Sequence, residues 1–208
     1  MKTYKNREEA GKLLAEKLES YKDKDALVLA IPRGGVVTGY EVSKALNLPL
    51  DIIVTRKIGY PGNEEYAVGA VDHEGNLHFS EAHLQLLEFH SIAEEIKNQI
   101  KEAKRRLELY RGDKALPKIK GKEVILVDDG IATGITMLLA IKNVRKEKPK
   151  RIVVAVPVAS TEAIDEIRKE VDEIIVLAPP EDFAGAVGSH YIEFEQVNDE
   201  EVIGLLKP

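Results

Sequence analysis

Cysteine and tryptophan are absent from this 208-residue sequence, and aromatic residues make up only 5% of it. Without cysteine the chain can form no disulfide, no thiolate metal site and no thiol nucleophile, which excludes several classes of secreted scaffold and enzyme. No apolar run approaches the roughly 18 residues of a membrane span, and the beginning of the chain lacks the apolar segment of a signal peptide. We therefore expect a cytoplasmic protein without a membrane partner.

An excess of positive charge is also absent. The formal net charge is −6 and the isoelectric point is near 5.5, which argues against a general nucleic-acid binder. Hydrophobic residues reach 44%, enough for a packed core, so intrinsic disorder is not expected either. The composition leaves small molecules as the natural partners of a single globular domain that covers residues 1–208.

Short apolar runs recur along the chain, and each is too short for a helix and lacks a polar face. They lie at residues 26–31, 52–55, 124–127, 152–156 and 174–177. Runs of this kind predict central strands of a parallel sheet that helices cover on both faces. Helical patterns separate them, at residues 8–18, 37–46, 136–144 and 161–171. The alternation predicts an α/β fold with a doubly wound, mainly parallel sheet.

Segments outside this alternation predict additional structure. In residues 58–80, a Gly-Tyr-Pro-Gly-Asn stretch precedes the apolar run AVGAV and the turn-like DHEGN, which predicts a flexible loop leading into a hairpin. Residues 80–111 carry a helical stripe that we expect in the core or at a dimer interface. The stripe consists of Ile92, Ile96, Ile100, Ala103, Leu107 and Tyr110. Residues 179–208 leave the sheet and form a predicted C-terminal hood or tail.

Ligands of an open parallel sheet bind beyond the carboxyl ends of its strands, so the residues that follow each apolar run matter most. One run is followed by Arg33-Gly34-Gly35, another ends at Arg56-Lys57, and a third ends at Asp128-Asp129. Cations and a Gly-Gly turn are therefore predicted to face a pair of carboxylates across one crevice.

The acid pair belongs to the stretch VILVDDGIATGIT, residues 124–136, which continues into a predicted helix. The first N–H groups of such a helix are unpaired and favour an anion, helped by the helix dipole. Thr133 and Thr136 add hydroxyl donors, and Gly134 lets the backbone close around a phosphate. Neither a Walker loop nor the dinucleotide pattern GxGxxG is present, so ATP and NAD are disfavoured.

Adjacent carboxylates would repel a phosphate unless they hold a cation or accept hydrogen bonds from hydroxyl groups. Ribose hydroxyls and Mg²⁺ supply those partners, so a sugar phosphate is the favoured ligand. Two alternatives stay open at this point. Asp128 and Asp129 could merely cap the helix of an ordinary α/β scaffold, or belong to a receiver domain. A receiver needs a phospho-acceptor Asp after a later strand, whereas Val156 is followed by Pro157 and Val158.

The stretch VILVDDGIATGIT resembles the signature of the type I phosphoribosyltransferases. Three further segments, AIPRGGVVTGYEVSKAL, VTRKIGYPGNEEYAVGAV and FAGAVGSHYIEFEQVNDEEV, are similar to a little-characterised branch of that family. The resemblance implies that Asp128 and Asp129 contact the ribose of phosphoribosyl pyrophosphate (PRPP). It implies that the 5-phosphate is bound by Gly130, Ile131, Ala132, Thr133, Gly134, Ile135 and Thr136. The implied pyrophosphate ligands are Arg33, Gly34, Gly35, Arg56 and Lys57.

The implied reaction is displacement of pyrophosphate from C1 of PRPP by a nitrogen nucleophile. Mg²⁺ is the implied cofactor, held mainly by PRPP, with Asp128 and Asp129 as candidate ligands. Because charge builds on the leaving group, Arg33, Lys57 and Asp129 are the candidate catalytic residues. The resemblance also implies that residues 58–80 close over the site and exclude water. Glu64 or Glu65 is then a candidate acid or base, and a homodimer is expected because dimers are common in the family.

The acceptor is open. Ala132 stands where the hypoxanthine and guanine branch of the family carries an acid, which disfavours that specificity. Ile135 replaces a glycine at a position that varies within the family. The hood is the candidate acceptor site, with Phe183 or Tyr191 as candidate rings to stack on a nucleobase. The alternative function is a regulatory protein of the same fold that senses PRPP or a nucleotide without turnover.

Overall fold

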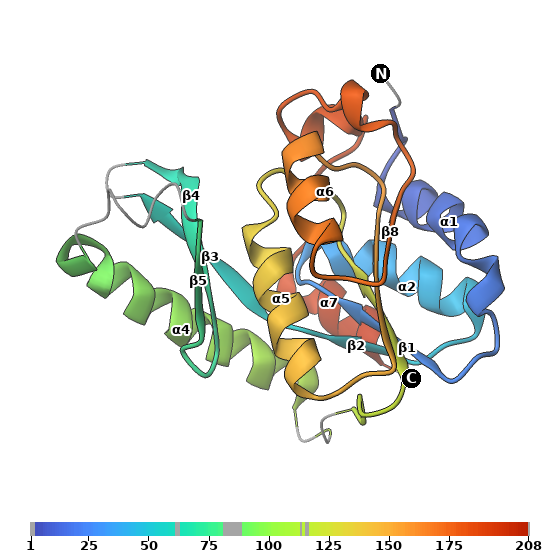
Figure 1. Cartoon of the computed structure of the whole chain (residues 1–208), viewed down its shortest axis with the longest axis horizontal. Coiled ribbons are helices and arrows are strands. Elements are labelled where there is room, and N and C mark those ends of the chain that lie inside the picture. Colours follow the sequence, from blue (N-terminus) through green and yellow to red (C-terminus); the bar gives the residue numbers. More distant parts are fainter. Residues whose placement is uncertain (1–2, 61–62, 81–88, 113, 115–116, 208) are drawn as a thin grey trace.

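A computed structural model of the chain describes residues 3–60, 63–80, 89–112, 114 and 117–207 (Figure 1). Its centre is a five-stranded sheet in the order β2-β1-β6-β7-β8, and every neighbouring pair is parallel. The strands are β1 (Ala26–Ala30), β2 (Leu50–Ile52), β6 (Glu123–Val127), β7 (Arg151–Val156) and β8 (Glu173–Val176). The predicted doubly wound parallel sheet is confirmed.

Helices cover both faces of this sheet. They are α1 (Arg7–Lys17), α2 (Gly34–Leu46), α5 (Ile135–Lys146) and α6 (Thr161–Arg168). Successive strand side chains point to opposite faces, so Leu27 and Leu29 of β1 pack with α5 and α6. Ala26 and Val28 pack with α1 and α2 on the other face. The strands are buried on both sides, which explains why their sequences lack a polar alternation.

The predicted strand at residues 52–55 is wrong in position. Pairing with β1 ends where Ala30 meets Ile52, and Thr55 already pairs with Asp72 in a second sheet. That antiparallel sheet has the order β3-β4-β5, with β3 (Thr55–Tyr60), β4 (Asn63–Asp72) and β5 (Leu77–Phe79). Arg56 and Lys57 are therefore strand residues and do not lie in a loop.

The second sheet and α4 (Phe89–Arg111) form an arm beside the main body (Figure 1). The predicted hairpin is confirmed by the pairing of β4 with β5. The apolar stripe of α4 is confirmed as core. Its first part packs on the arm sheet around Ile58, and its second part packs on α2 and α7 of the body. The predicted beginning of this helix falls at residues 81–88, outside the described residues.

The C-terminal segment folds back over the carboxyl ends of the strands. It contains the short turns η2 (Pro180–Asp182) and η3 (Val187–His190) and the helix α7 (Asp199–Leu206), which Asn198 caps. Tyr4 forms a parallel bridge with Tyr191, so the N-terminal segment and this hood lie side by side. None of the described helices is both long and apolar enough to span a bilayer.

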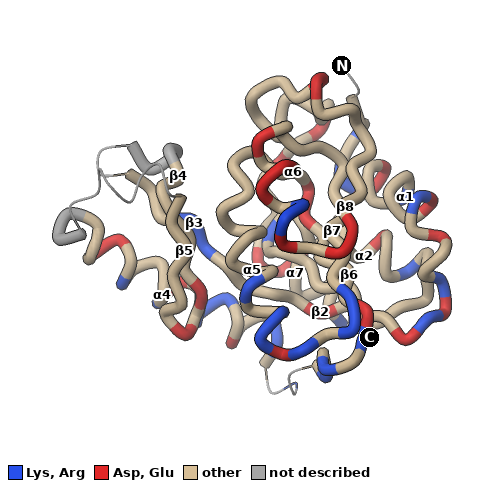
Figure 2. The backbone as a smooth tube through the Cα atoms, viewed as in Figure 1, with Lys and Arg blue, Asp and Glu red and all other residues tan. Residues whose placement is uncertain are grey.

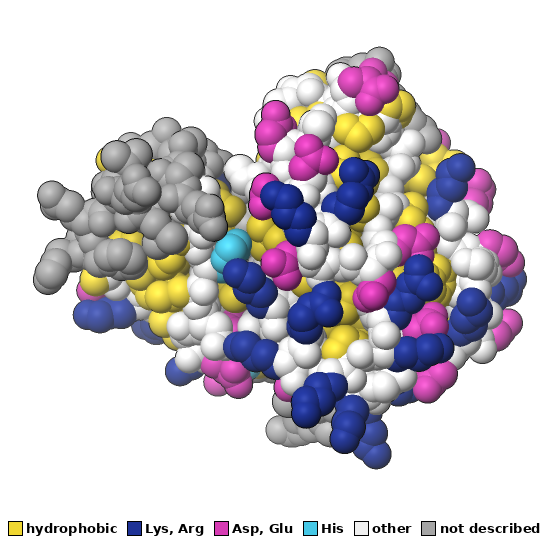
Figure 3. Space-filling model, in the orientation of Figure 1, with side chains coloured by type: hydrophobic (Ala, Val, Ile, Leu, Met, Phe, Trp, Pro, Cys, Tyr) yellow, Lys and Arg dark blue, Asp and Glu magenta, His cyan; other side chains and the backbone are white. Residues whose placement is uncertain are grey.

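Charges are distributed unevenly along α5. Figure 2 shows Lys and Arg gathered at the end of α5 and in the turn that follows, including Arg145 and Lys146 in its last turn. Cations favour the C-terminal end of a helix, so these residues suit a solvated position. Figure 3 shows both signs of charge interspersed over the same face, with a notch between the arm and the body. The opposite, N-terminal end of α5 is where the acid pair lies.

Candidate active site

The acid pair follows β6, which lies between β1 and β7 at the centre of the sheet. Asp128 Oδ1 accepts the backbone N–H of Asp129 at 2.8 Å, and Asp129 Oδ2 accepts the Nε–H of Arg7 at 2.6 Å. Burial and the negative charge of Asp129 raise the pKa of Asp128 well above its usual range. Asp129 therefore has a cation beside it, whereas Asp128 is held in a site that favours its neutral form.

Arg7 was not identified by sequence reasoning. It lies in the first turn of α1, and its side chain and that of Asp129 are only 12% and 15% exposed. A second guanidinium nitrogen donates to the carbonyl of Glu195 at 2.8 Å, and the group stacks 3.8 Å from the ring centroid of Phe194. The hood thus fixes Arg7, and Arg7 fixes Asp129.

The Gly34-Gly35 pair begins α2 directly against the acid pair. A Cβ added to Gly34 would overlap Asp129 Oδ2 and lie 2.8 Å from Arg7 Nε. A Cβ added to Gly35 would lie 2.7 Å from Asp128 Oδ1. The preceding Pro32–Arg33 peptide bond is cis. Both glycines are required here because the α2 backbone and the two carboxylates share one small space.

The loop after the acid pair encloses a pocket of about 340 Å³ in front of the first turn of α5. The lining residues are Lys57, Ala67, Asp129, Gly130, Ile131, Ala132, Thr133, Gly134, Ile135, Thr136 and Val187. Gly134 has φ +77°, a left-handed conformation that favours glycine, immediately before the helix. The predicted cradle residues are therefore brought together in one concave site.

This loop is fixed by the connection between β7 and α6. Ile131 exchanges backbone hydrogen bonds with Val158 and Ser160, at 2.9 and 3.0 Å. The Ser160 hydroxyl donates to the carbonyl of Ala132 at 2.6 Å and accepts the N–H of Ala163 as the cap of α6. Sequence reasoning also missed Ser160, although a serine before a helical pattern is a recognisable cap signal. The cradle is thus held in shape before a ligand arrives.

Arg56 and Lys57 point to opposite faces of β3, as successive residues of a strand must. Lys57 lines the pocket beside the loop. Arg56 instead donates from Nε to the side chain of Gln99 on α4 at 2.8 Å. The structure therefore brings only one of these two predicted pyrophosphate ligands to the cradle.

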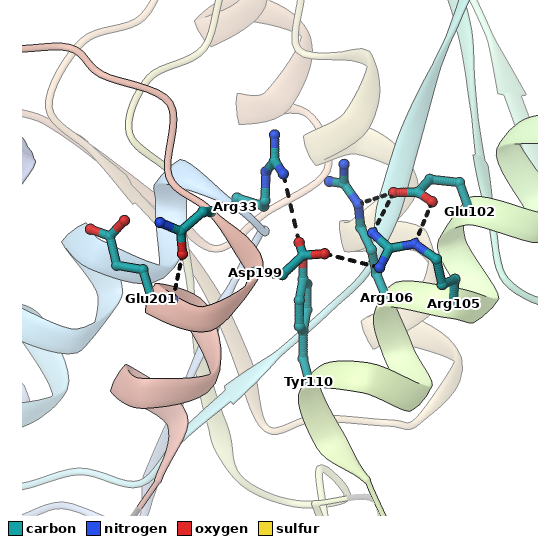
Figure 4. Close-up of polar contacts among 8 residues, drawn as sticks. Arg33, Glu102, Arg105, Arg106, Tyr110, Asp199 and Glu201 are labelled. Carbon is teal, nitrogen blue, oxygen red and sulfur yellow. Dashed lines mark hydrogen bonds and ion pairs between the residues drawn. The ribbon is translucent and has the colours of Figure 1, made fainter.

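Arg33 likewise faces away from the cradle. Its guanidinium lies 3.6 Å from Asp199 at the beginning of α7, between α2 and α4 (Figure 4). It is nevertheless the residue that precedes Gly34, so its backbone lies next to the acid pair while its side chain reaches the C-terminal helix.

The two candidate acceptor residues lie in the hood. Tyr191 is 7% exposed, and its hydroxyl donates to the carbonyl of Asp129 at 2.6 Å. Phe183 stacks on His190 with ring centroids 5.6 Å apart. The side chains of Glu64 and Glu65 lie outside the described residues. The structure thus places Tyr191 and Phe183 in the packing of the hood around the acid pair.

Replacing Asp128 by Asn should stabilise the protein near neutral pH. Because the folded-state pKa of Asp128 is raised, its contribution to stability is present below the unfolded value of about 3.9 and is lost as pH rises through the folded value. Asn keeps the acceptor for Asp129 N–H without the buried charge. We expect a Tm increase of about 2–4 °C at pH 7, roughly 1 kcal/mol, that vanishes near pH 3. Thermal unfolding from pH 3 to 8 measures it, and an equal change at every pH would contradict the explanation.

Comparison with known proteins adds to this geometry. The model of the phosphoribosyl transferase domain matches residues 2–191. A Mycobacterium tuberculosis protein provisionally named as a phosphoribosyl transferase is 35% identical over 211 residues, covering 99% of this chain and 47% of that protein. The chain thus spans about half the length of the curated relatives it matches.

The crystal structure of TT1426 from Thermus thermophilus is 41% identical with a TM-score of 0.80, covering 99% of this chain and 98% of that one. A uracil phosphoribosyltransferase of Mycoplasma genitalium is 40% identical over 57 residues, 27% of this chain and 28% of that protein.

Proposed function

The chain belongs to the family of phosphoribosyl transferase domains, and from this premise we propose that it transfers the 5-phosphoribosyl group of PRPP to a nitrogen acceptor. Pyrophosphate is the second product, and the acceptor is a nucleobase or a related nitrogen compound. One observation carries the proposal: Asp129 of the acid pair, the loop at the beginning of α5 and Lys57 line a single pocket. An anion site next to an acceptor for hydroxyl groups matches the chemistry of a ribose 5-phosphate.

Each part of the pocket has a task in this proposal. The N–H groups of the loop and of the first turn of α5, with the hydroxyls of Thr133 and Thr136, bind the 5-phosphate. Asp129 accepts a hydrogen bond from a ribose hydroxyl while Arg7 fixes its orientation. Lys57 approaches from β3 as a point charge beside the phosphate. These groups hold C1 of the sugar in a constant position while the leaving group departs.

The donor set also suits Mg²⁺ carried by the substrate. Mg²⁺ is usually held by one or two carboxylates together with substrate phosphates, and Asp128 and Asp129 offer that pair. Within the described residues no group of three or more His, Cys, Asp or Glu side chains gathers to hold a metal. A Mg²⁺ ion bound mainly by PRPP would offset the charge that develops on the leaving pyrophosphate.

In the reaction, the bond between C1 and the pyrophosphate oxygen breaks, and its electron pair leaves with pyrophosphate. The acceptor nitrogen forms the new bond to C1 and gives up its proton. Positive charge on the sugar ring is highest between these events, so the Asp129 carboxylate, which lines the pocket, stabilises it. The arm beside the pocket is placed to exclude water, which would otherwise capture the same carbon.

A second candidate is a sensor that binds PRPP or a nucleotide without turnover. It is favoured by one observation, that Asp129 and Arg33 are both paired with the chain's own residues, Arg7 and Asp199. Release of pyrophosphate in the presence of an acceptor separates the two functions. The partial match to a uracil phosphoribosyltransferase makes uracil the first acceptor to test, followed by other pyrimidine and purine bases.

Calorimetric titration with PRPP, with and without Mg²⁺, tests the proposal directly. We expect binding that needs Mg²⁺ and that weakens about 10- to 100-fold in the Asp128→Asn/Asp129→Asn variant, because Asp129 loses the charge with which it accepts a ribose hydroxyl and the pair holds Mg²⁺ less well. Asp165→Asn is the matched control, since Asp165 lies on the exposed face of α6 in a surface ion pair with Arg168. A folded wild-type protein that does not bind PRPP would overturn the proposed function.

A further inference from the structure

A single residue outside the cradle holds two consecutive carbonyl groups of its loop. Ser160 donates its backbone N–H to the carbonyl of Ile131 at 3.0 Å, and its hydroxyl donates to the carbonyl of Ala132 at 2.6 Å. It follows β7, directly precedes α6 and is only 8% exposed. Two successive peptide groups of the loop are therefore turned with their oxygens toward the same buried neighbour.

The direction of these carbonyl groups fixes the direction of the N–H groups that follow them. In a planar trans peptide the C=O and the N–H point in opposite directions. The N–H groups of Ala132 and Thr133 therefore point away from Ser160. Ala132 and Thr133 line the pocket, whereas Ser160 does not belong to its described lining. Both N–H groups are thus directed to the pocket side of the loop.

These two N–H groups are left for a ligand. Within the described part of the chain, neither Ala132 nor Thr133 donates its N–H to a carbonyl or to a side chain. Gly134 follows them, and the first turn of α5 then adds its own unpaired N–H groups. Successive backbone N–H groups that face one concave space favour an anion, and the dipole of α5 acts in the same direction.

The hydroxyl of Ser160 serves two partners with opposite needs. It donates to Ala132, and it also accepts the N–H of Ala163 at 3.1 Å and so caps α6. Asp would cap the helix equally well, but an ionised carboxylate cannot donate to a carbonyl. α6 lies beside α5 and shares a core cluster with it (Figure 1). The hydroxyl therefore connects the loop to a part of the body that is packed independently of any ligand.

We propose that Ser160 is a positioning residue for phosphate binding, which holds the carbonyls of Ile131 and Ala132 away from the pocket and so presents the N–H groups of Ala132 and Thr133 to the anion. Without the hydroxyl, the peptide between Ala132 and Thr133 is free to rotate, and a carbonyl oxygen that faces the pocket repels a phosphate. The identification of this anion with the 5-phosphate of PRPP rests on the proposed function.

Calorimetric titration of the full chain with ribose 5-phosphate tests this role. Ser160→Ala should weaken binding about 3- to 10-fold, because the loop loses a hydrogen bond that preorganises it. Ser160→Thr keeps a hydroxyl and should bind within about 2-fold of the wild type. Asn198→Ala is the matched control, because Asn198 caps α7, a helix of 8 residues like α6, by accepting the N–H of Glu201 at 2.8 Å. It should lower Tm about as much as Ser160→Ala and leave the affinity unchanged.

Nuclear magnetic resonance of isotope-labelled protein shows whether the two N–H groups receive the anion. The amide proton signals of Ala132 and Thr133 should move downfield on titration with ribose 5-phosphate and with inorganic phosphate, because a charged acceptor makes a short hydrogen bond. In Ser160→Ala the same movement should need a correspondingly higher ligand concentration. The loss of a helix cap alone, as in Asn198→Ala, would leave both titrations unchanged.

The outcomes separate this role from the proposed function. If Ser160→Ala and Asn198→Ala lower Tm alike and both keep the wild-type affinity, Ser160 is only a helix cap and the inference is wrong. The proposed function stands in that case, provided that PRPP binding depends on the acid pair. The inference is also wrong if neither phosphate ligand moves the signals of Ala132 and Thr133. If these signals move in a Ser160-dependent way while PRPP releases no pyrophosphate with any acceptor, the positioning role stands and the proposed transfer fails.

Discussion

Replacing Gly34 by Ala is expected to abolish measurable PRPP binding and to lower the free energy of unfolding by about 2–4 kcal/mol. The added Cβ would overlap Asp129 Oδ2 and lie 2.8 Å from Arg7 Nε. The carboxylate cannot turn aside cheaply, because Arg7 holds it and the Glu195 carbonyl and the Phe194 ring hold Arg7. Either the ion pair breaks or the beginning of α2 moves away from the acid pair. Both outcomes displace the groups proposed to bind the sugar.

Urea denaturation gives the loss of stability, and calorimetric titration gives the loss of binding. Gly204→Ala is the matched control, because Gly204 lies on the exposed side of α7 with open space around its Cα. That substitution should leave binding unchanged and stabilise the helix by up to about 1 kcal/mol. A Gly34→Ala protein with wild-type stability and affinity would show that the close approach of α2 to Asp129 is not needed.

The fold was predictable where burial alone determines the pattern. The runs of β6 and β7 are apolar on both faces because helices cover both faces of the sheet. The run at residues 52–55 was misread because its composition suits either sheet. What ends β2 is its register with β1 at Ile52, and what begins β3 is the pairing of Thr55 with Asp72. Both depend on contacts that a local pattern does not contain.

The candidate site, too, was predictable from the sequence only in part. The cradle is local, since a strand end, a loop and the beginning of a helix lie within residues 124–136, and its shape follows from the order of those elements. Arg7 and Asp199 contact Asp129 and Arg33 from distant parts of the chain. Only the packing of the hood and α7 brings them there. The directions of Arg33 and Arg56 were missed for a related reason, because the position of a residue after a strand does not fix where a long side chain points.

The second large loss of stability is expected when the Arg7–Asp129 ion pair is broken. Arg7→Gln is expected to lower the free energy of unfolding by about 2–4 kcal/mol, because it leaves a largely buried carboxylate without its cation. It also removes the guanidinium that stacks on Phe194, so the hood should loosen over the acid pair. Arg168→Gln is the matched control. Its ion pair with Asp165 is 67% and 60% exposed, and we expect a change within about 0.5 kcal/mol.

A double-mutant cycle separates the ion pair from the packing of the arginine. If the cost of Arg7→Gln is mainly the unpaired charge of Asp129, then Arg7→Gln/Asp129→Asn should recover about 1–3 kcal/mol of it, because Asn carries no charge to leave unpaired. Chemical denaturation of the four proteins measures this coupling. Additive losses would mean that Arg7 acts through its stack on Phe194 and its hydrogen bond to Glu195, and that Asp129 keeps its orientation without it. The first result makes Arg7 a positioning residue for the proposed ribose contact, since the carboxylate that accepts the hydroxyl is then fixed by a charge from α1.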